Sequence, residues 1–180
     1  MHRPIMTTRR FAELDLALCQ RANRACAWRI VRRFFRAISR LGDGKFWYVL
    51  MLVLPVVHGH AGLVVSLQMA IAGVLGVAVY KLVKHLTHRP RPYVSDASIM
   101  LGAAPLDQYS FPSGHTLHAV SFTLLVCAAF PAWAWLLVPF AALVAMSRVV
   151  LGLHYPTDVL LGAAIGTGLA TLVPYLPLPA

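Results

Sequence analysis

The sequence has little charge, and very little acidic charge. Only 12% of its 180 residues are Asp, Glu, Lys or Arg, and six acidic residues stand against 16 Lys and Arg. Soluble globular domains carry about 25% charged residues, whereas here 59% of residues are hydrophobic and the mean hydropathy is +0.70. Apolar runs near the length that spans a bilayer recur along the chain. The composition excludes an ordinary soluble domain and indicates a membrane protein.

Cysteine is also scarce, with three residues in the whole chain. Cys19 and Cys26 are seven positions apart, which on a helix is about 10 Å and too far for a disulfide. Cys127 lies inside an apolar run and is expected to be a small core residue. We therefore expect no disulfide framework. A cleavable signal peptide is not expected either, because no apolar segment follows the first arginines.

The positive charge is concentrated near the N-terminus. Eleven of the 16 Lys and Arg lie in residues 1–45, four lie in residues 81–91, and the last is Arg148. A basic end can bind nucleic acid, but in so hydrophobic a chain it favours anionic lipid headgroups. We expect membrane lipids, and no nucleic acid, as partners of this segment.

Residues 21–41 are predicted to form one amphipathic helix in the headgroup region. Its apolar positions recur at three- and four-residue spacing and are Ala27, Ile30, Val31, Phe34, Ile38 and Leu41. Arginines occupy much of the other side, and the residues "LGDG" at 41–44 end the helix. This divides the chain into a basic segment, 1–44, and a hydrophobic domain, 45–180.

The hydrophobic domain is predicted to be an all-α bundle, which with the N-terminal helix makes about five or six helices. Expected spans cover residues 46–57, 61–80, 116–130, 132–151 and 159–176. Gly162, Gly166 and Gly168 are expected to permit close helix packing. Two crossings separate residue 115 from residue 154, so the polar loop 81–115 and the stretch 147–158 should emerge on the same membrane face.

Three polar segments would then meet at that face. "KHLTHRPRP" carries Lys84 and Arg91, and its Arg-Pro pairs should end the preceding helix. "FPSGHTLHAV" carries Ser113, Gly114 and His115 at a predicted helix start. Ser113 can cap that helix, and free N–H groups at a helix N-terminus favour an anion.

The third segment is "SRVVLGLHYPTD", which carries Arg148, His154 and Asp158. Pro156 suits the first position of the last helix, and Asp158 would fall in its first turn. Asp158 is four residues beyond His154 and could accept a hydrogen bond from the imidazole. Such a bond selects the tautomer and stabilises positive charge on the ring.

A metal site is the alternative use of these side chains. His115, His154 and Asp158 are residue types that bind zinc, but the three cations of the same segments oppose a divalent ion. Fixed Lys and Arg side chains suit a phosphate group, to which Arg offers a bidentate fork. We therefore predict a phosphate site with no metal and no cofactor.

These segments resemble the three signature motifs of the type 2 phosphatidic acid phosphatase (PAP2) superfamily. The matching positions are Lys84, Arg91 and Pro92, then Pro112 to His115, then Ser147, Arg148, His154 and Asp158. The resemblance implies that His154 is the nucleophile, Asp158 orients it and His115 is the general acid. Lys84, Arg91, Ser113, Gly114 and Arg148 would bind the phosphate oxygens.

The resemblance also implies an integral-membrane, metal-independent phosphatase that forms a phosphohistidine. Its substrate would be a lipid phosphate or diphosphate, such as a polyprenyl phosphate, phosphatidylglycerol phosphate, phosphatidic acid or phosphorylated lipid A. A lipid phosphotransferase and a vanadate-dependent haloperoxidase are the alternatives, and the spans oppose the latter. A multi-pass protein of the bacterial cytoplasmic membrane is expected. The N-terminal arginines favour an active site on the cytoplasmic face, whereas bacterial relatives more often face outward.

Overall fold

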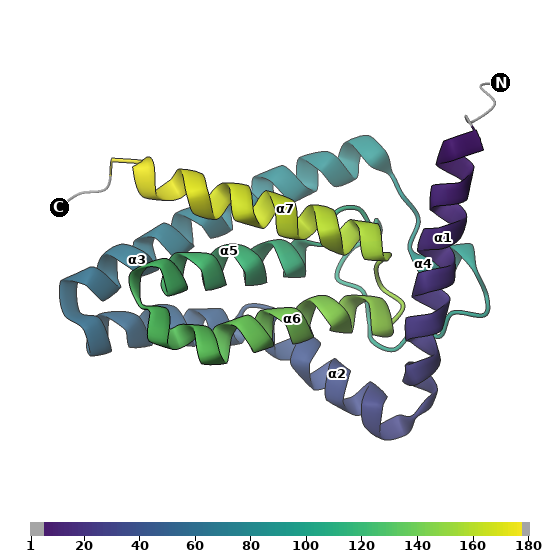
Figure 1. The fold of residues 1–180 in the computed structure, drawn as a ribbon, viewed down its shortest axis with the longest axis horizontal. Helices are drawn as coiled ribbons and strands as arrows, with labels where there is room; N and C mark the ends of the chain where they lie inside the picture. The colour runs from purple at the N-terminus through teal and green to yellow at the C-terminus, as the bar shows by residue number, and fades with distance from the viewer. Residues whose placement is uncertain (1–5, 178–180) are drawn as a thin grey trace.

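All of the regular secondary structure in the described part of the chain is helical, which confirms the predicted all-α class. A computed structural model describes residues 6–177, and within that range it contains no β-strand. The α-helices are α1 (Met6–Asn23), α2 (Arg29–Leu41), α3 (Lys45–Thr87), α4 (Pro92–Ser95), α5 (Gly114–Ala129), α6 (Ala134–Val150) and α7 (Pro156–Leu172). Short 3-10 turns cover Arg24–Ala27, Pro131–Trp133 and Val173–Tyr175. Helices α3, α5, α6 and α7 form the bundle, and α1 crosses one of its ends (Figure 1).

Helix α3 folds back on itself and supplies both of the first two predicted spans. The reversal lies at Gly59, whose φ of 58° and ψ of −136° are not helical. A side chain is excluded just after the turn, because a Cβ on Gly62 would lie 2.0 Å from the carbonyl oxygen of Leu54. The two legs can therefore pack closely, and they run away from α2 and back again (Figure 1).

Within residues 6–177, three helical stretches are long and apolar enough to cross a membrane. They are Lys45–Ser95, which includes both legs of α3, Pro131–Val150 and Pro156–Tyr175, and Gly114–Ala129 is a shorter apolar helix. The main core lies between the bundle helices and is centred on large buried side chains, among them Trp47, Leu54, Met69, Val126 and Leu137. Burial of this apolar surface holds the bundle together where the helices face one another.

Small residues bring α7 against α5, as the sequence predicts for two of three glycines. A Cβ on Gly162 would lie 2.5 Å from the carbonyl oxygen of Ser113, and one on Gly166 would lie 2.4 Å from that of Leu117. The prediction for Gly168 is wrong, because nothing lies within 4 Å of its Cβ position. The spacing of small residues does not show that Gly168 lies outside the contact between α7 and α5.

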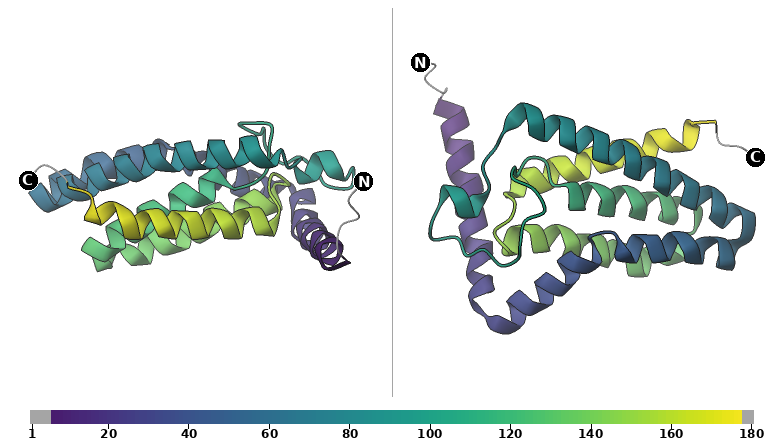
Figure 2. Two further views of the ribbon diagram at one scale, coloured as in Figure 1. Left: turned by 90° about the horizontal axis from the view of Figure 1, so that it is seen from above. Right: turned by 180° about the vertical axis from the view of Figure 1, so that it is seen from behind.

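The predicted helix over residues 21–41 is wrong at its start. The chain is already helical from Met6 in α1, turns a corner at Arg24–Ala27, and begins α2 at Arg29 (Figure 2). The side chain of Asn23 fixes the corner, since its amide nitrogen donates to the carbonyls of Met100 and Val150, each at 2.9 Å. These contacts join residues far apart in sequence, so local periodicity does not reveal the break.

Helix α2 keeps the predicted amphipathic character and directs part of its apolar face outward. Ile30, Phe34 and Leu41 are exposed. Arg36 instead turns toward the protein, where its Nε donates to the carbonyl of Gly102 at 2.9 Å. An exposed apolar face next to arginines is typical of a helix at the membrane surface.

Candidate active site

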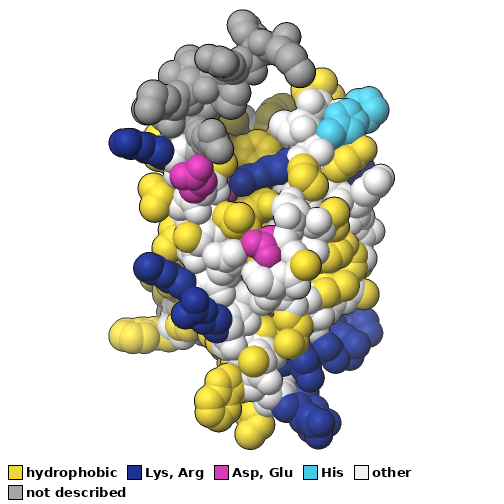
Figure 3. Space-filling view, turned by 90° about the vertical axis from the view of Figure 1, so that its right-hand side faces the viewer, with side chains coloured by type: hydrophobic (Ala, Val, Ile, Leu, Met, Phe, Trp, Pro, Cys, Tyr) yellow, Lys and Arg dark blue, Asp and Glu magenta, His cyan; other side chains and the backbone are white. Residues whose placement is uncertain are grey.

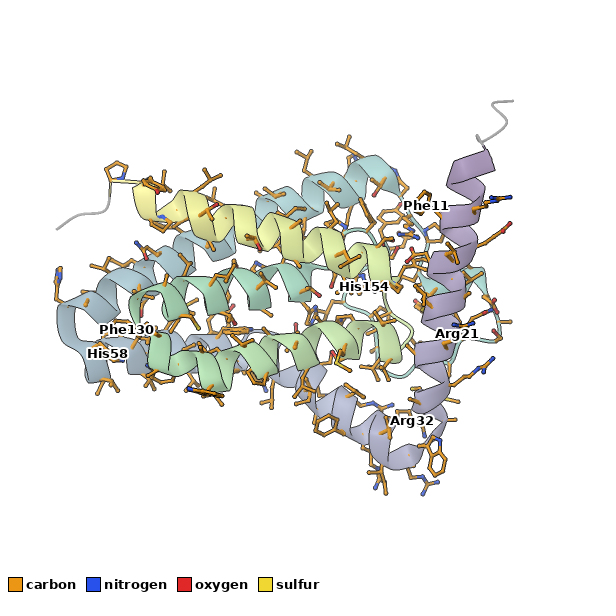
Figure 4. All side chains as sticks on the ribbon, viewed as in Figure 1. Phe11, Arg21, Arg32, His58, Phe130 and His154 are labelled. Atoms are coloured by element: carbon orange, nitrogen blue, oxygen red, sulfur yellow. The ribbon has the colours of Figure 1, made fainter. Side chains whose placement is uncertain are left out.

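The three predicted segments meet at the end of the bundle that α1 crosses. His154 lies at this end, and His58 and Phe130 lie at the other (Figure 4). Viewed from this end, Lys and Arg side chains lie at the surface with scattered acidic ones among hydrophobic residues (Figure 3). One cavity of about 930 Å³ is lined by Lys84, Arg91, Gly114, His115, Arg148 and His154, among others. The structure therefore brings the three segments together at one end of the bundle, as the parity of the crossings predicts.

His154 sits in the turn between α6 and α7 and is 2% exposed. Its backbone N–H donates to the carbonyl of Arg148 at 3.0 Å. Its ring Nε2 faces Nη1 of Arg91 at 3.4 Å. A guanidinium can only donate, so this approach assigns the free lone pair to Nε2 and the proton to Nδ1. The lone pair therefore points toward the cations of the cavity.

Asp158 lies behind the His154 ring. As predicted, α7 begins at Pro156, and Asp158 in its first turn accepts the N–H of Tyr155 at 2.8 Å. The other contact of the same oxygen, Oδ2, is with Nδ1 of His154 at 3.5 Å. That separation is too long for a strong hydrogen bond, and Nδ1 has no hydrogen-bond partner among the described residues. Catalytic hydrogen bonds are often long without substrate and shorten in the complex.

The environment keeps His154 neutral. Burial, and then the nearby cations of Arg148, Arg91 and Lys84, lower the pKa of His154 well below its ordinary value of 6.5. A neutral imidazole has the lone pair that a nucleophile needs. The ring is therefore in its reactive form at neutral pH.

Lys84 and Arg91 both contact the carboxylate of Asp107. Lys84 is in the last turn of α3, which ends at Thr87 before the Arg-Pro pairs as predicted. Its Nζ lies 2.7 Å from Oδ1 of Asp107, and Nη2 of Arg91 lies 2.7 Å from the same oxygen. Partial burial raises the pKa of Asp107, but the hydrogen bond and charge of Lys84 outweigh it and lower the pKa. The two predicted phosphate-binding cations therefore already hold one anionic group.

Arg148 completes the cationic wall from α6. It is 3% exposed, and its Nη1 donates a short hydrogen bond to Oγ of Ser39, a residue of α2. Its Nε has no partner among the described residues. A buried guanidinium with an unpaired N–H is costly without an anion nearby, so this side chain is suited to bind one.

The start of α5 forms the opposite wall. Ser113 is its N-cap residue, as predicted, but its side chain makes no capping hydrogen bond. The hydroxyl lies 3.0 Å from that of Thr116, and the side chain is fully buried behind the cavity. Gly114 and His115 do line the cavity. Nε2 of His115 lies 3.3 Å from Oδ1 of Asp43, and that hydrogen bond lowers the pKa of Asp43.

The carboxylates around the site are the feature that sequence reasoning missed. Four of the six acidic residues contact a basic or histidine side chain in or directly behind the cavity, and we call them the acidic layer. They are Asp15, Asp43, Asp107 and Asp158. The motifs predict Asp158 alone. The rarity of acidic residues in so hydrophobic a chain is the signal that could have identified the other three.

The cavity changes character along its length. Beyond the charged end it is lined by apolar side chains of α3, among them Trp47, Met51, Met69, Val74 and Val77. This part lies between legs that are apolar enough to cross a membrane. The site therefore joins an anion-binding end to a hydrocarbon-like wall.

These features place the chain in a known class. The sequence profile of the PAP2 superfamily matches residues 61–179, more than half of the chain. The chain belongs to the PAP2 superfamily. The earlier resemblance is thereby confirmed.

Particular relatives and structures agree with this assignment. An undecaprenyl-diphosphatase of Sulfolobus acidocaldarius is 30% identical over 110 residues, which cover 60% of this chain and 53% of that protein. A decaprenylphosphoryl-5-phosphoribose phosphatase of Mycolicibacterium smegmatis is 30% identical over 129 residues, which cover 71% of this chain and 68% of that one. The crystal structure of Aquifex aeolicus LpxE matches with a TM-score of 0.75 and 25% identity, over 91% of this chain and 96% of that one.

A second solved structure matches at the level of the fold. It is the transmembrane PAP2-type phosphatidylglycerolphosphate phosphatase of Bacillus subtilis, with a TM-score of 0.68 and 23% identity, over 91% of this chain and 84% of that one. The match spans about half the length of several curated relatives, 53% and 52% for the first two. With the apolar helices described above, the fold is that of an integral membrane protein.

Proposed function

We propose that the protein is a phosphatase that hydrolyses a phosphate or diphosphate monoester of a membrane lipid. The observation that carries the proposal is the direction of the His154 lone pair, which faces Arg91 at 3.4 Å inside a cavity that Lys84 and Arg148 also line. A nucleophile beside three cations is suited to attack a phosphoryl group, because the cations bind its oxygens and lower their repulsion.

A lipid substrate is supported by the two ends of the cavity. The charged end fits a phosphate, and the apolar wall of α3 fits a hydrocarbon chain. The relatives include an undecaprenyl-diphosphatase and a decaprenylphosphoryl-5-phosphoribose phosphatase, and one structural neighbour is a phosphatidylglycerolphosphate phosphatase. A small water-soluble phosphate would leave the apolar wall unused.

The chemistry takes two steps. In the first, Nε2 of His154 attacks phosphorus, and a P–N bond forms as the P–O bond to the lipid breaks. His115 donates a proton to the departing oxygen. The ionised Asp43 at 3.3 Å stabilises the protonated ring, against burial and the charge of Arg148, which lower the pKa of His115 to about 4. Asp158 stabilises the positive charge that develops on His154.

In the second step, water attacks the phosphohistidine. The P–N bond breaks, its electrons return to Nε2 of His154, and His115 accepts a proton from the water. Inorganic phosphate leaves and both rings return to their starting forms. Lys84, Arg91, Arg148 and the Gly114 N–H stabilise the oxygens in both transition states. Ser113 is buried behind this wall and reaches an oxygen only if its side chain rotates.

The test is phosphate release by the purified full-length protein from a panel of lipid phosphates. The panel contains polyprenyl mono- and diphosphate, phosphatidylglycerol phosphate, phosphatidic acid and phosphorylated lipid A. We expect release from at least one of them and an acid-labile phosphoryl group on the wild-type protein that His154→Ala lacks. No release from any lipid would contradict the proposal. Phosphate that appears on a second lipid instead of in solution would identify a phosphotransferase.

The reaction is proposed to need no metal ion. The three cations already neutralise the phosphate, and within residues 6–177 no three His, Cys, Asp or Glu side chains gather in a metal-binding arrangement. We expect turnover to survive excess EDTA and to be inhibited by vanadate, which adopts the five-coordinate geometry of the transition state. Loss of turnover in EDTA that only a stoichiometric metal restores would contradict this.

The N-terminal arginines are proposed to bind anionic lipid headgroups at the surface of a bacterial cytoplasmic membrane. Arg29, Arg33 and Arg40 are exposed on α2, next to its outward apolar side chains. Binding should weaken with salt, because the Debye length falls to about 10 Å at 0.1 M. The measurement is activity in neutral and anionic nanodiscs at two salt concentrations, with a variant in which these arginines are Gln. An equal effect of anionic lipid on both proteins would contradict the proposal.

A further inference from the structure

An ion-pair network lies behind His154 and reaches into the N-terminal helix; its two carboxylates are buried and its guanidinium, that of Arg89, is 28% exposed. Asp158 is fully buried, and Nη1 of Arg89 lies 2.6 Å from its Oδ1. Nη2 of the same Arg89 lies 2.7 Å from Oδ2 of Asp15, which is on α1 and 4% exposed. Arg89 occupies an unassigned position in the first motif, and Asp15 lies outside the matched region 61–179. Neither residue stands at a position that defines one of the three motifs.

The two carboxylate oxygens of Asp158 make different contacts, and Arg89 determines which oxygen faces His154. Because the guanidinium holds Oδ1, Oδ2 is left to accept the N–H of Tyr155 and to face Nδ1 of His154. The guanidinium also lies over the Tyr155 ring, with its carbon 4.0 Å from the ring centroid. A rotation of the Asp158 carboxylate away from His154 would break its contacts with Arg89 and with the Tyr155 N–H. The ion pair with Arg89 therefore fixes the orientation of this carboxylate.

Arg89 cancels the negative charge of Asp158, and Asp15 adds a second negative charge to the network. A guanidinium in contact with Asp158 opposes the effect of that carboxylate on His154. The second carboxylate leaves one net negative charge behind the imidazole, and in a buried setting such charges act strongly. Asp15 is itself held by the start of α7, since its Oδ1 accepts the N–H of Thr157 at 3.0 Å.

We propose that Arg89 and Asp15 are positioning residues for His154 and act through Asp158. The inference rests on the proposed phosphatase function. It makes α1 part of the catalytic machinery, and not only a membrane-surface segment. Helix α1 also contacts the nucleophile's own backbone, because Sγ of Cys19 lies 3.8 Å from the carbonyl oxygen of His154.

Several other charged and titratable groups face the His154 ring, and none of them is altered in the test. They are Lys84 of α3, Arg91 before α4, His115 of α5 and Arg148 of α6. An effect of a change at Asp15 on the titration of His154 can therefore be assigned to the network behind the ring.

The test is Asp15→Asn in the full-length protein, assayed on a lipid phosphate that the wild type hydrolyses. The amide keeps the size of the side chain and can still accept the Thr157 N–H, but it loses the charge. We expect kcat to fall about tenfold or more with KM within about twofold, and the acid limb of kcat/KM to move to lower pH. Asp15→Glu should recover most of kcat.

The matched control is Asp96→Asn. Asp96 also contacts α1, because Nε2 of Gln20 donates to its Oδ2 at 2.8 Å, but Asp96 does not touch Arg89. We expect its kcat and pH profile to stay those of the wild type. Arg89→Lys is the second variant, which keeps the positive charge and loses the fork. Its kcat should also fall about tenfold at unchanged KM.

The outcomes separate this inference from the proposed function. If no lipid phosphate is hydrolysed by the wild type, the proposed function fails. If the wild type is active and His154→Ala is not, but folded Asp15→Asn keeps the wild-type kcat and pH limb, only the inference is overturned. A lower melting temperature with normal kcat per folded enzyme would assign Asp15 a structural role and also overturn it. If Asp15→Asn does not fold, a wild-type kcat for folded Arg89→Lys overturns it.

Discussion

The two layers of the site differ in charge and in where they come from along the chain. We call Lys84, Arg91 and Arg148 the cationic layer; it faces His154, comes from the bundle helices and their ends, and lies in the first and third motifs. The acidic layer surrounds it, and two of its members, Asp15 and Asp43, come from the N-terminal 44 residues. The two layers are joined by direct ion pairs.

The difference shows how a hydrophobic chain keeps buried cations near lipid. An unpaired charge at the edge of the bilayer costs several kcal/mol. Lys84 and Arg91 share Asp107, Arg89 lies between Asp15 and Asp158, and Arg148 donates to Ser39. The cationic layer should therefore determine whether the reaction occurs, and the acidic layer should set its rate and its substrate affinity.

The largest effect should come from the nucleophile that the cationic layer surrounds. We expect His154→Ala to lower phosphate release by at least about 10²-fold, the scale of a catalytic group, while the protein stays folded in the membrane. Two other histidines that line the cavity are held elsewhere, since Nε2 of His115 lies 3.3 Å from Asp43 and Nε2 of His118 lies 3.2 Å from the carbonyl oxygen of Gly73. Activity above about a tenth of wild type would contradict a phosphohistidine. His85→Ala, in the last turn of α3 and outside the defining motif positions, is the matched control.

Asp158→Asn tests the member of the acidic layer that faces His154 directly. The amide can accept the Tyr155 N–H, so the helix start should survive, but the charge that stabilises imidazolium is lost. We expect kcat to fall by about 10- to 10²-fold with KM little changed. Steady-state kinetics on folded protein check this. A change confined to KM would mean that Asp158 contacts the substrate and not the nucleophile.

The cationic layer could be predicted from sequence because its residues stand at fixed positions within the motifs. The Arg-Pro pairs follow the end of α3 and Pro156 starts α7 where expected, and the parity of the crossings brings His115 and His154 to one cavity. Residue type and position within a motif were enough for these side chains. The bundle itself could be predicted for the same reason, since its helices are set by apolar length.

The acidic layer could not be predicted, because its contacts depend on how the N-terminal segment packs. Asp15 meets Arg89 across 74 residues, and only the corner after Asn23 lets α1 lie across the end of the bundle. Periodicity predicted one helix over 21–41, which would carry α1 elsewhere. Long-range side-chain hydrogen bonds override local pattern at such corners, and a single sequence does not reveal them.

The pH dependence tests whether the cations keep the nucleophile neutral. Burial and the three cations lower the pKa of His154 well below 6.5. Protonation of His154 removes the lone pair that attacks phosphorus. Because a lowered pKa keeps the ring unprotonated at more acidic pH, the acid limb of kcat/KM should lie below pH 6.5. Each pH unit below the limb should cost about tenfold. The substrate's own pKa, about 6 for a phosphate monoester, is measured separately by ³¹P titration. If the acid limb of kcat/KM lies at or above pH 6.5 and does not coincide with the substrate's pKa, the proposal that the His154 ring is neutral is contradicted.

The smallest effect should come from Asp107, where the two layers compete for the same cations. Its carboxylate contacts Lys84 and Arg91 at 2.7 Å each, and its side chain is 39% exposed, so it can move aside. A phosphate that binds these cations must replace it. Asp107→Asn keeps the shape but weakens the ion pairs, and we expect KM to fall a few-fold with kcat within about twofold. Asp96→Asn, the same change in the same loop away from the cations, should leave KM unaltered. A rise in KM for Asp107→Asn would show that the carboxylate holds Lys84 and Arg91 in place for the substrate, and that the two layers cooperate at this point instead of competing.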